Sequence, residues 1–336
     1  MRVFPTSLLA LAVVAAFSQE GRTAETTILG TGSAFAQPIY SRWASEEAKE
    51  TGLHLNYQPS GSGIGQNQVL KGLTDFGASD VPMDDDKLKQ GDILQFPTVA
   101  GGYAVVVNLP GVRSNELRLT ADALADIFMG NIRRWDDARI ASLNPGLKLP
   151  KMEIALLYHA GGSGGTYALS RYLSKASEAW RKRMGVGMTL DWPVGAGVKG
   201  SFGAATTTPV TAGSIAYAEF SYAVANHLTT IQLRNKAGRF VAPSGETFAA
   251  AVESADWKSA AHFAVDLTDT PGEQSWPIVT PTFVLVPMGS HKAGTSEAVM
   301  KFFSWAFAHG DDAARSLQYV PLPAPIKAEI MTTLGK

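Results

Sequence analysis

The stretch 155–173 of the sequence reads ALLYHAGGSGGTYALSRYL and joins a short apolar run to a segment with helical spacing. Between these two parts lie four glycines and one serine, at positions 161–165. The first backbone N–H groups of a helix have no partner inside the helix and carry partial positive charge, and glycine lets a ligand approach them closely. The stretch therefore predicts a strand, a turn and a helix whose start is suited to bind an anion.

Two other turns have the same character. Residues 29–40 read LGTGSAFAQPIY, in which Pro38 suits a first helical turn, and residues 58–70 read QPSGSGIGQNQVL. Each turn lies between a predicted strand and a predicted helix. One Gly–Ser turn before a helix is often only a cap, but three helix starts that converge on one cleft would make an oxyanion site.

An aspartate follows another predicted strand, in residues 75–83, DFGASDVPM. Asp80 suits the cap of the next helix, and it also suits an anion that carries a proton. A carboxylate accepts a hydrogen bond from such a proton and disfavours an anion that has none. Asp80 would thereby make a site prefer hydrogenphosphate to sulfate.

Short β-like runs alternate with helical patterns along the chain, which predicts an α/β fold with open sheets. Two expected strands, 101–108 and 278–287, are long and apolar and are separated by the middle half of the chain. We interpret them as paired crossovers between two lobes, with a ligand cleft between the lobes. Other strands are expected at 26–29, 53–57, 75–78, 154–157 and 215–217, and helices at 39–49, 122–129, 167–173, 177–184, 245–251 and 295–309.

The composition limits the partners of the chain. Its 336 residues include 29 basic and 30 acidic side chains, a formal charge of −1, so no overall field attracts nucleic acid or an anionic membrane. The sequence has no cysteine, which excludes disulfides, thiolate metal ligands, a cysteine nucleophile and a lipoprotein anchor. The histidines lack the spacing of a metal site, so we expect no metal and no cofactor.

The N-terminus has the pattern of a signal peptide. Residues 8–17, LLALAVVAAF, have the length of an apolar signal segment and are too short to span a bilayer. We predict a signal peptide over 1–18, with cleavage as late as residue 24; the alternative is a buried N-terminal helix. The mature chain is expected to be a soluble, monomeric protein of the periplasm.

Several stretches of the chain match one family, in the same order and with the same spacing along the sequence. They are 30–35 with Pro38 and Tyr40, 56–58, 75–80, 95–99, 101–102, 135–137, 143–150, 192–193 and 215–219. On these residues the chain resembles the periplasmic phosphate-binding proteins of the bacterial ABC phosphate transporter.

This resemblance implies a fold, a domain division and a function. The fold is the type II periplasmic-binding-protein fold, two α/β lobes joined by hinge strands, with lobe I at 25–103 plus 283–336 and lobe II at 104–282. The function is capture of phosphate or a related oxyanion for an ABC permease in the inner membrane, without catalysis. Some relatives instead sense a ligand for a membrane kinase, which stays open as an alternative.

The resemblance also implies individual ligand contacts. Phe35 matches a backbone amide donor, Ser62 a hydroxyl donor, Asp80 the proton acceptor, and Ser163 with Gly164 the donors at the third helix start. Four positions depart from the family pattern: Ala34 and Gly165 stand in place of threonines, His159 in place of an arginine, and Gly161 in place of the aspartate that holds this arginine. The last two losses belong together, because the aspartate has no role without the arginine.

These departures affect affinity and ligand choice. Charge-assisted hydrogen bonds contribute roughly 1.5–3 kcal/mol each, so their loss would weaken phosphate binding unless other groups replace them. The small residues Ala34, Gly161 and Gly165 would also make the pocket wider than the family pattern does. A wider pocket would admit phosphite, arsenate, arsenite or a phosphonate. We expect an anion to raise the pKa of His159 and to bind more tightly at pH ~6 than at pH ~8. The alternative is a histidine packed at the cleft wall.

A serine hydrolase is the remaining alternative. Residues 161–165 match the G-x-S-x-G nucleophile pattern between a strand and a helix, and Asp266 and His291 follow in the chain. Glycine-rich turns match this pattern easily, and the resemblance assigns Ser163 to ligand binding instead.

Overall fold

The computed structural model of the chain describes residues 26–289 and 293–334. The predicted signal peptide, 1–18 with its later limit at residue 24, lies outside these ranges, and so does His291. Within the described ranges, no helix combines the length and the apolar character needed to cross a membrane.

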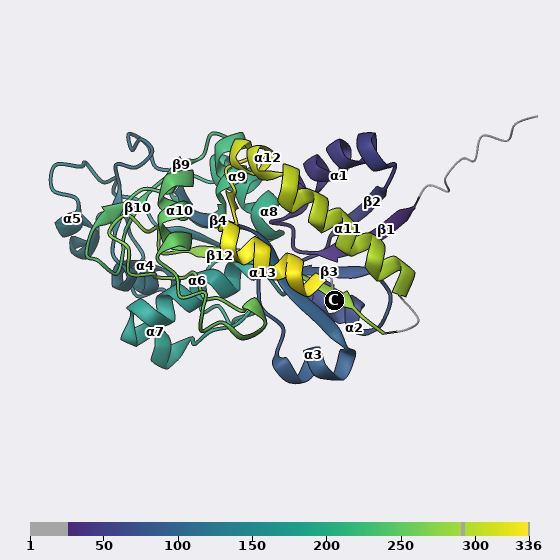
Figure 1. Ribbon diagram of the computed structural model, residues 1–336. Coiled ribbons are helices and arrows are strands. Elements are labelled where there is room, and N and C mark those ends of the chain that lie inside the picture. Colours follow the sequence, from purple (N-terminus) through teal and green to yellow (C-terminus); the bar gives the residue numbers. More distant parts are fainter. Residues whose placement is uncertain (1–25, 290–292, 335–336) are drawn as a thin grey trace, which may run out of the picture.

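One large sheet extends across both halves of the molecule (Figure 1). Its strands lie in the order β2 (His54–Pro59), β1 (Thr27–Gly32), β3 (Phe76–Ser79), β12 (Val279–Pro287), β4 (Ile93–Val107), β8 (Ser214–Glu219), β6 (Ala155–His159) and β7 (Ala196–Val198), while β13 (Val320–Pro321) and β9 (Thr229–Thr230) also pair with β4. A small second sheet contains β11 (Phe240–Val241), β10 (Gln232–Arg234) and β5 (Arg118–Leu119).

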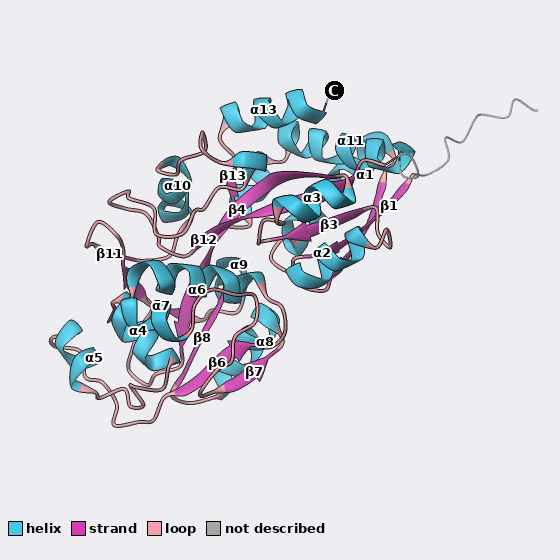
Figure 2. Ribbon diagram, turned by 90° about the horizontal axis from the view of Figure 1, so that it is seen from below, coloured by secondary structure: helices cyan, strands magenta, loops and turns pink. Residues whose placement is uncertain are grey.

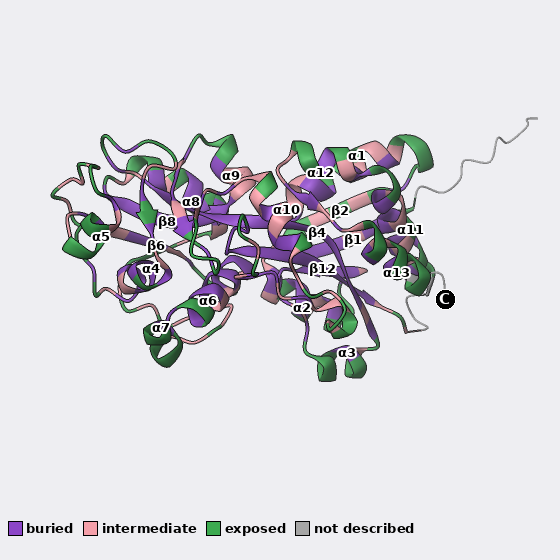
Figure 3. Cartoon of the chain, turned by 60° about the vertical axis from the view of Figure 1, so that its left-hand side comes forward, coloured by how far each residue is buried: buried purple, intermediate pink, exposed green. Residues whose placement is uncertain are grey.

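The helices form two groups around this sheet, one in each half. The half that contains β1 to β3 carries α1 (Gln37–Thr51), α2 (Ser62–Leu70), α3 (Asp85–Gly91), α11 (Ala293–His309), α12 (Asp311–Ser316) and α13 (Ala324–Leu334). The other half carries α4 (Ala121–Phe128), α5 (Ala138–Leu143), α6 (Gly164–Ala176), α7 (Glu178–Arg183), α8 (Gly200–Thr207) and α9 (Phe220–Ala225), and α10 (Gly245–Glu253) packs on β4, β12 and β13. The large strands are mostly buried, and exposed residues concentrate on helices and loops (Figure 3).

Two strands connect the halves (Figure 2). β4 pairs antiparallel with β12 from Ile93 to Gly102, and it then pairs with β8 from Tyr103 to Val107. The predicted pairing of two long crossover strands is therefore confirmed, and the chain has the expected two-lobe α/β fold. The halves are linked through continuous strands, an arrangement that permits hinge motion between lobes.

The expected start of β4 at residue 101 was wrong, because the strand begins at Ile93. The missed part contains polar residues and a proline, which obscure a strand pattern. Its polar side chains are nevertheless buried and bonded: Gln95 accepts a hydrogen bond from the Met83 amide at 2.7 Å, and Thr98 bonds to the Tyr40 hydroxyl at 2.7 Å. The sequence patterns also missed α3, α5, α8, α9, α12 and α13, most of which are short.

Candidate anion-binding site

The three predicted glycine-rich turns border one cavity of about 570 Å³ between the halves. The helices that follow the turns begin at Gln37 (α1), Ser62 (α2) and Gly164 (α6). Of the eight predicted ligand positions, six line this cavity: Ala34, Ser62, Asp80, His159, Ser163 and Gly164. Segments that are far apart in the sequence thus meet around a single polar space, as the turn patterns predicted.

The other two predicted positions, Phe35 and Gly165, are not among the residues that line the cavity, but each directly follows one that does, Ala34 and Gly164. The Phe35 ring packs against the rings of Tyr103 and Tyr319, at centroid distances of 5.7 and 5.1 Å, and the Tyr319 hydroxyl donates to the Phe35 carbonyl at 2.6 Å. A Cβ at Gly165 would lie 2.5 Å from the Tyr103 ring and 3.1 Å from the His159 ring. The aromatic rings therefore occupy the space beside residue 165, and the pocket is not widened there.

Asp80 lies at the end of β3 and is held by four hydroxyl groups. Ser33 and Thr282 donate to its Oδ1 at 2.6 and 2.7 Å. Tyr103 and Ser62 lie farther from Oδ2, at 3.3 and 3.4 Å. The two oxygens thus differ, because Oδ1 has short bonds inside the protein and Oδ2, with long bonds only, is the atom able to accept a short bond from a ligand.

The protonation of Asp80 follows from this setting. Asp80 is only 2% exposed, and burial raises the pKa of its carboxyl group to about 6. The hydrogen bonds from the surrounding hydroxyls, Ser33 first, oppose this rise. At neutral pH Asp80 is consequently an ionised acceptor, as the sequence analysis required.

His159 fits the alternative given in the sequence analysis, a histidine packed at the cleft wall, and not the cation. Its Nε2 lies 2.9 Å from the Tyr217 carbonyl oxygen, which can only accept, so Nε2 carries the proton. Its Nδ1, 2.8 Å from Ser163 Oγ, then accepts from that hydroxyl. Burial lowers the pKa of His159 to about 4, whereas we expected a bound anion to raise it. The ring is neutral and packed at the cleft wall, and the predicted tighter binding at pH ~6 loses its basis.

The neutral state of His159 is directly measurable. In an NMR titration of the imidazole resonances, we expect the His159 signals to stay constant from pH ~8 down to pH ~5.5, because charging the buried ring also breaks its bond from Ser163. A His159→Gln variant assigns the signals. A His159 titration midpoint near pH ~6.5, or above it after anion addition, would contradict this assignment and restore the cationic role.

Ser163 has two partners within the protein. Its hydroxyl donates to His159, and its oxygen accepts from the Thr166 amide at 3.3 Å, which caps α6. Ser163 can donate to an anion only by releasing His159. The donors that remain ready at this helix start are its first backbone N–H groups, which have no partner inside the helix.

The structure adds cleft residues that the sequence analysis missed. Tyr103 on β4 and Glu219 at the end of β8 line the cavity, together with Lys199 and Ser201 at the start of α8. The α8 start is a fourth helix end at this cleft, and Lys199 is an exposed cation at its border. The only signal in the sequence was the glycine at position 200 after a lysine, which resembles many surface turns.

The two halves are in close contact at the cleft. A Cβ at Gly164 on α6 would lie 2.4 Å from Asp80 Oδ2 and 2.8 Å from Ser62 Oγ. A Cβ at Gly61 would lie 3.1 Å from the carbonyl oxygen of Gly162. These residues belong to opposite sides of the cavity, so the helix starts approach Asp80 as closely as glycine allows.

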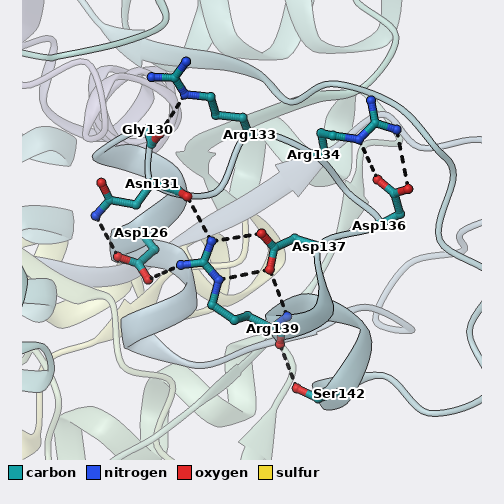
Figure 4. A network of polar contacts seen from close by, with 9 residues as sticks. All are labelled: Asp126, Gly130, Asn131, Arg133, Arg134, Asp136, Asp137, Arg139 and Ser142. Carbon is teal, nitrogen blue, oxygen red and sulfur yellow. Dashed lines mark hydrogen bonds and ion pairs between the residues drawn. The ribbon is translucent and has the colours of Figure 1, made fainter.

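Among the described residues, no arginine lines the cavity in place of the one absent at position 159. In an exposed network beside α4 and α5, Arg139 pairs with Asp126 at 3.0 Å and with Asp137 at 2.9 Å, and Arg134 pairs with Asp136 at 3.0 Å (Figure 4). These cations are engaged by carboxylates, and none of the five residues lines the cavity.

A second hollow, of about 610 Å³, lies between α10, α12 and α13. Its cations Arg315 and Lys327 both pair with Asp311, and Glu246 and Glu253 add negative charge. This hollow is poorly suited to an anion, so the cleft at Asp80 is the better candidate.

The geometry does not favour the hydrolase alternative. Asp266 pairs with Arg171 and Lys175, each at 2.8 Å, and does not line the cavity of Ser163. The histidine that contacts Ser163 is His159, whose pKa of about 4 makes it a weak base at neutral pH.

The chain has two lobes, and the starts of several helices surround a cavity between them. This arrangement places the chain in the class of two-lobe periplasmic-binding proteins. The model of the PBP superfamily domain matches residues 18–309 of the chain. The chain is 43% identical to a protein of Pasteurella multocida named phosphate-binding protein PstS, and the match covers 92% of both chains. It is 44% identical to a protein of the same name from Haemophilus influenzae, with 90% of this chain and 91% of the relative covered. The chain therefore belongs to the PstS family of phosphate-binding proteins.

Solved structures share the fold. A high-affinity periplasmic phosphate-binding protein bound with phosphate aligns with a TM-score of 0.73 at 21% identity, covering 91% of this chain and 93% of its own. A putative phosphate ABC transporter substrate-binding protein with bound phosphate from Clostridium perfringens aligns with a TM-score of 0.66 at 15% identity, covering 89% of this chain and 100% of its own.

Proposed function

We propose that the protein captures hydrogenphosphate, or a closely related oxyanion, in the cleft at Asp80 and delivers it to an ABC permease. The observation that carries this proposal is the convergence of three helix starts on one cavity that also contains a buried, ionised carboxylate. The names of the PstS relatives support phosphate as the ligand and an ABC transporter as the partner. Neither a sensor kinase nor hydrolysis has comparable support.

The ligand contacts in this proposal combine backbone and side-chain groups. The backbone amides of Phe35 and of the α6 start at Gly164 and Gly165 donate to the anion, and the Ser62 hydroxyl adds a donor. Asp80 Oδ2 accepts the proton of the anion. Lys199 at the cleft border adds an exposed, water-screened positive charge where His159 adds none, and it is the only lysine or arginine among the described residues that line the cavity.

The proposal includes the broader setting. We infer an exported, monomeric protein of the periplasm that binds without catalysis and closes by hinge motion of β4 and β12. The division into lobe I (25–103 plus 283–336) and lobe II (104–282) remains part of this proposal. It is supported by the change of β4 partner from β12 to β8 at Tyr103.

Calorimetric titration with a panel of anions tests the function. The panel contains phosphate, sulfate, phosphite, arsenate, arsenite and methylphosphonate. We expect phosphate to bind at least about 100-fold more tightly than sulfate, because sulfate leaves the buried Asp80 carboxylate facing an anion without a proton, a loss of roughly 3 kcal/mol. Phosphate that does not bind, or sulfate that binds equally well, contradicts the proposal. A tighter fit of another protonated oxyanion would change the ligand but not the chemistry of the site.

A further inference from the structure

Two buried carboxyl groups flank one tyrosine hydroxyl in the cleft. Tyr103 on β4 and Glu219 on β8 are directly opposite in the antiparallel pairing of these strands. The Tyr103 hydroxyl lies 3.3 Å from Asp80 Oδ2 and 3.4 Å from Glu219 Oε1. Asp80 and Glu219 are 2% and 3% exposed, and all three residues line the same cavity.

One hydroxyl proton cannot serve two carboxylates. If both carboxyls were ionised, Tyr103 could donate to only one of them, and the other would lie against a bare oxygen. A carboxyl that carries its own proton can instead donate to the Tyr103 oxygen. The single arrangement that satisfies all three groups is a chain from a protonated carboxyl through Tyr103 to an ionised carboxylate.

The structure indicates which carboxyl is protonated. Asp80 has short hydrogen bonds from Ser33 and Thr282, which stabilise its negative charge. No side chain in the described part of the chain donates a short hydrogen bond to Glu219, since Tyr103 lies 3.4 Å from Oε1, and Oε2 is buried without a hydrogen-bond partner. Burial and the charge of Asp80 raise the pKa of Glu219 to about 8. The proton therefore belongs on Glu219.

The other groups that face Glu219 do not alter this assignment. They are Tyr217 on the same strand, Tyr222 on α9, Tyr319 before β13, and Lys199 at the border of the cavity. Burial raises the pKa of each of the three tyrosines, so they stay neutral. Lys199 is exposed and screened by water, and His159 is neutral, so a second carboxylate would have little compensation in the cleft.

We propose that Glu219 is a specificity-determining residue that works in its protonated form, by holding the Tyr103 hydroxyl on Asp80 and keeping the cleft at one negative charge when the anion enters. This inference rests on the proposed capture of an oxyanion. Ionisation of Glu219 would release Tyr103 from Asp80 and add a charge that repels the ligand. Glu219 thus sets the upper pH limit of anion binding, and Asp80 sets the lower one.

Phosphate titrations at about pH 8, 9 and 10 and constant ionic strength test the inference, because hydrogenphosphate is the dominant form of phosphate throughout this range. We expect the wild-type Kd to rise about tenfold or more from pH 8 to pH 10, and the Kd of Glu219→Gln to change less than about threefold, since the amide donates and does not ionise. Glu246→Gln, an exposed glutamate of α10, is the matched control and should keep the wild-type pH dependence. Lys199→Gln should bind more weakly but keep the same dependence.

Parallel slopes for wild type and Glu219→Gln would overturn the inference while leaving phosphate capture intact. A ligand-free measurement separates the two ideas further. A carboxyl with a raised pKa stabilises the folded state at low pH, and this contribution is lost as the pH rises from the ordinary value of 4.5 to about 8. The urea midpoint of the wild type should therefore fall relative to Glu219→Gln across this window and level off above it. A constant difference overturns the inference, even if phosphate does not bind.

Discussion

Gly164→Ala is expected to lower phosphate affinity by roughly 100-fold or more. The added methyl group would lie 2.4 Å from Asp80 Oδ2, 2.6 Å from Asp80 Cβ and 2.8 Å from Ser62 Oγ, distances that protein Cβ atoms do not tolerate. Overpacking of this kind costs roughly 1–3 kcal/mol even when the surroundings shift, and here the shift moves α6 away from β3 and α2. The clash is relieved by opening the cleft, so the lobes themselves should stay folded.

Calorimetry and small-angle X-ray scattering check this expectation together. With saturating phosphate, the wild type should show a smaller radius of gyration than Gly164→Ala. Gly162→Ala is the matched control, because a methyl group there meets its nearest atom, Gly63 Cα, at 3.8 Å, an ordinary contact. Wild-type affinity in Gly164→Ala would mean that the α6 start does not close on Asp80 in the bound state.

Asp80→Asn is expected to reduce the preference for phosphate over sulfate by roughly 100-fold. An amide at the Oδ2 position presents N–H donors where the carboxylate accepts the proton of the ligand, so phosphate loses a charge-assisted bond of about 1.5–3 kcal/mol. Sulfate gains, because the amide donates to its oxygens and the negative charge is gone. The measurement is the ratio of the two dissociation constants at pH ~7.

The control for this variant is Asp312→Asn, since Asp312 is fully exposed on α12 and should leave the ratio unchanged. An unchanged ratio in Asp80→Asn would remove the carboxylate from ligand selection. A related loss should appear in the wild type, whose phosphate affinity should fall as the pH drops below about 6, because Asp80 then takes up a proton and stops accepting.

The raised pKa of Asp80 also affects stability, with a definite sign. The folded state favours the protonated form, so Asp80 contributes stability that is fully present below pH 3.8 and is lost as the pH rises through about 6. The difference amounts to about 3 kcal/mol. The ionised Asp80 carboxylate therefore destabilises the folded state at neutral pH. Its role as acceptor of the ligand's proton explains why this buried charge is present in the cleft.

Much of the fold was readable from local patterns. The stretches around 29–40, 58–70 and 155–173 each contain a strand, a glycine-rich turn and a helix start, and the structure has these elements there. Glycine and proline placement acts over a few residues, so such turns are visible without tertiary information. Asp80, Ser62 and Ser163 were found in the same way, because each directly follows a strand or lies at the start of a helix.

The charge states of the groups in the cleft could not be predicted from the sequence. Tyr103 and Glu219 are neighbours only because β4 pairs with β8 across more than one hundred residues, and no local pattern indicates this register. Burial keeps His159 neutral by lowering its pKa, an effect opposite to the rise that we expected from a bound anion. For His159 the sequence indicated a possible cation, whereas desolvation and the Tyr217 carbonyl decided its protonation state.

The sequence by itself determined that this protein has an α/β fold with three anion-suited helix starts and one aspartate, because these depend on residue types within short segments. Only the tertiary structure decided which donors are free, which carboxyl is protonated and where glycine is indispensable. Those properties arise from distances and desolvation between segments that the chain brings together from different lobes.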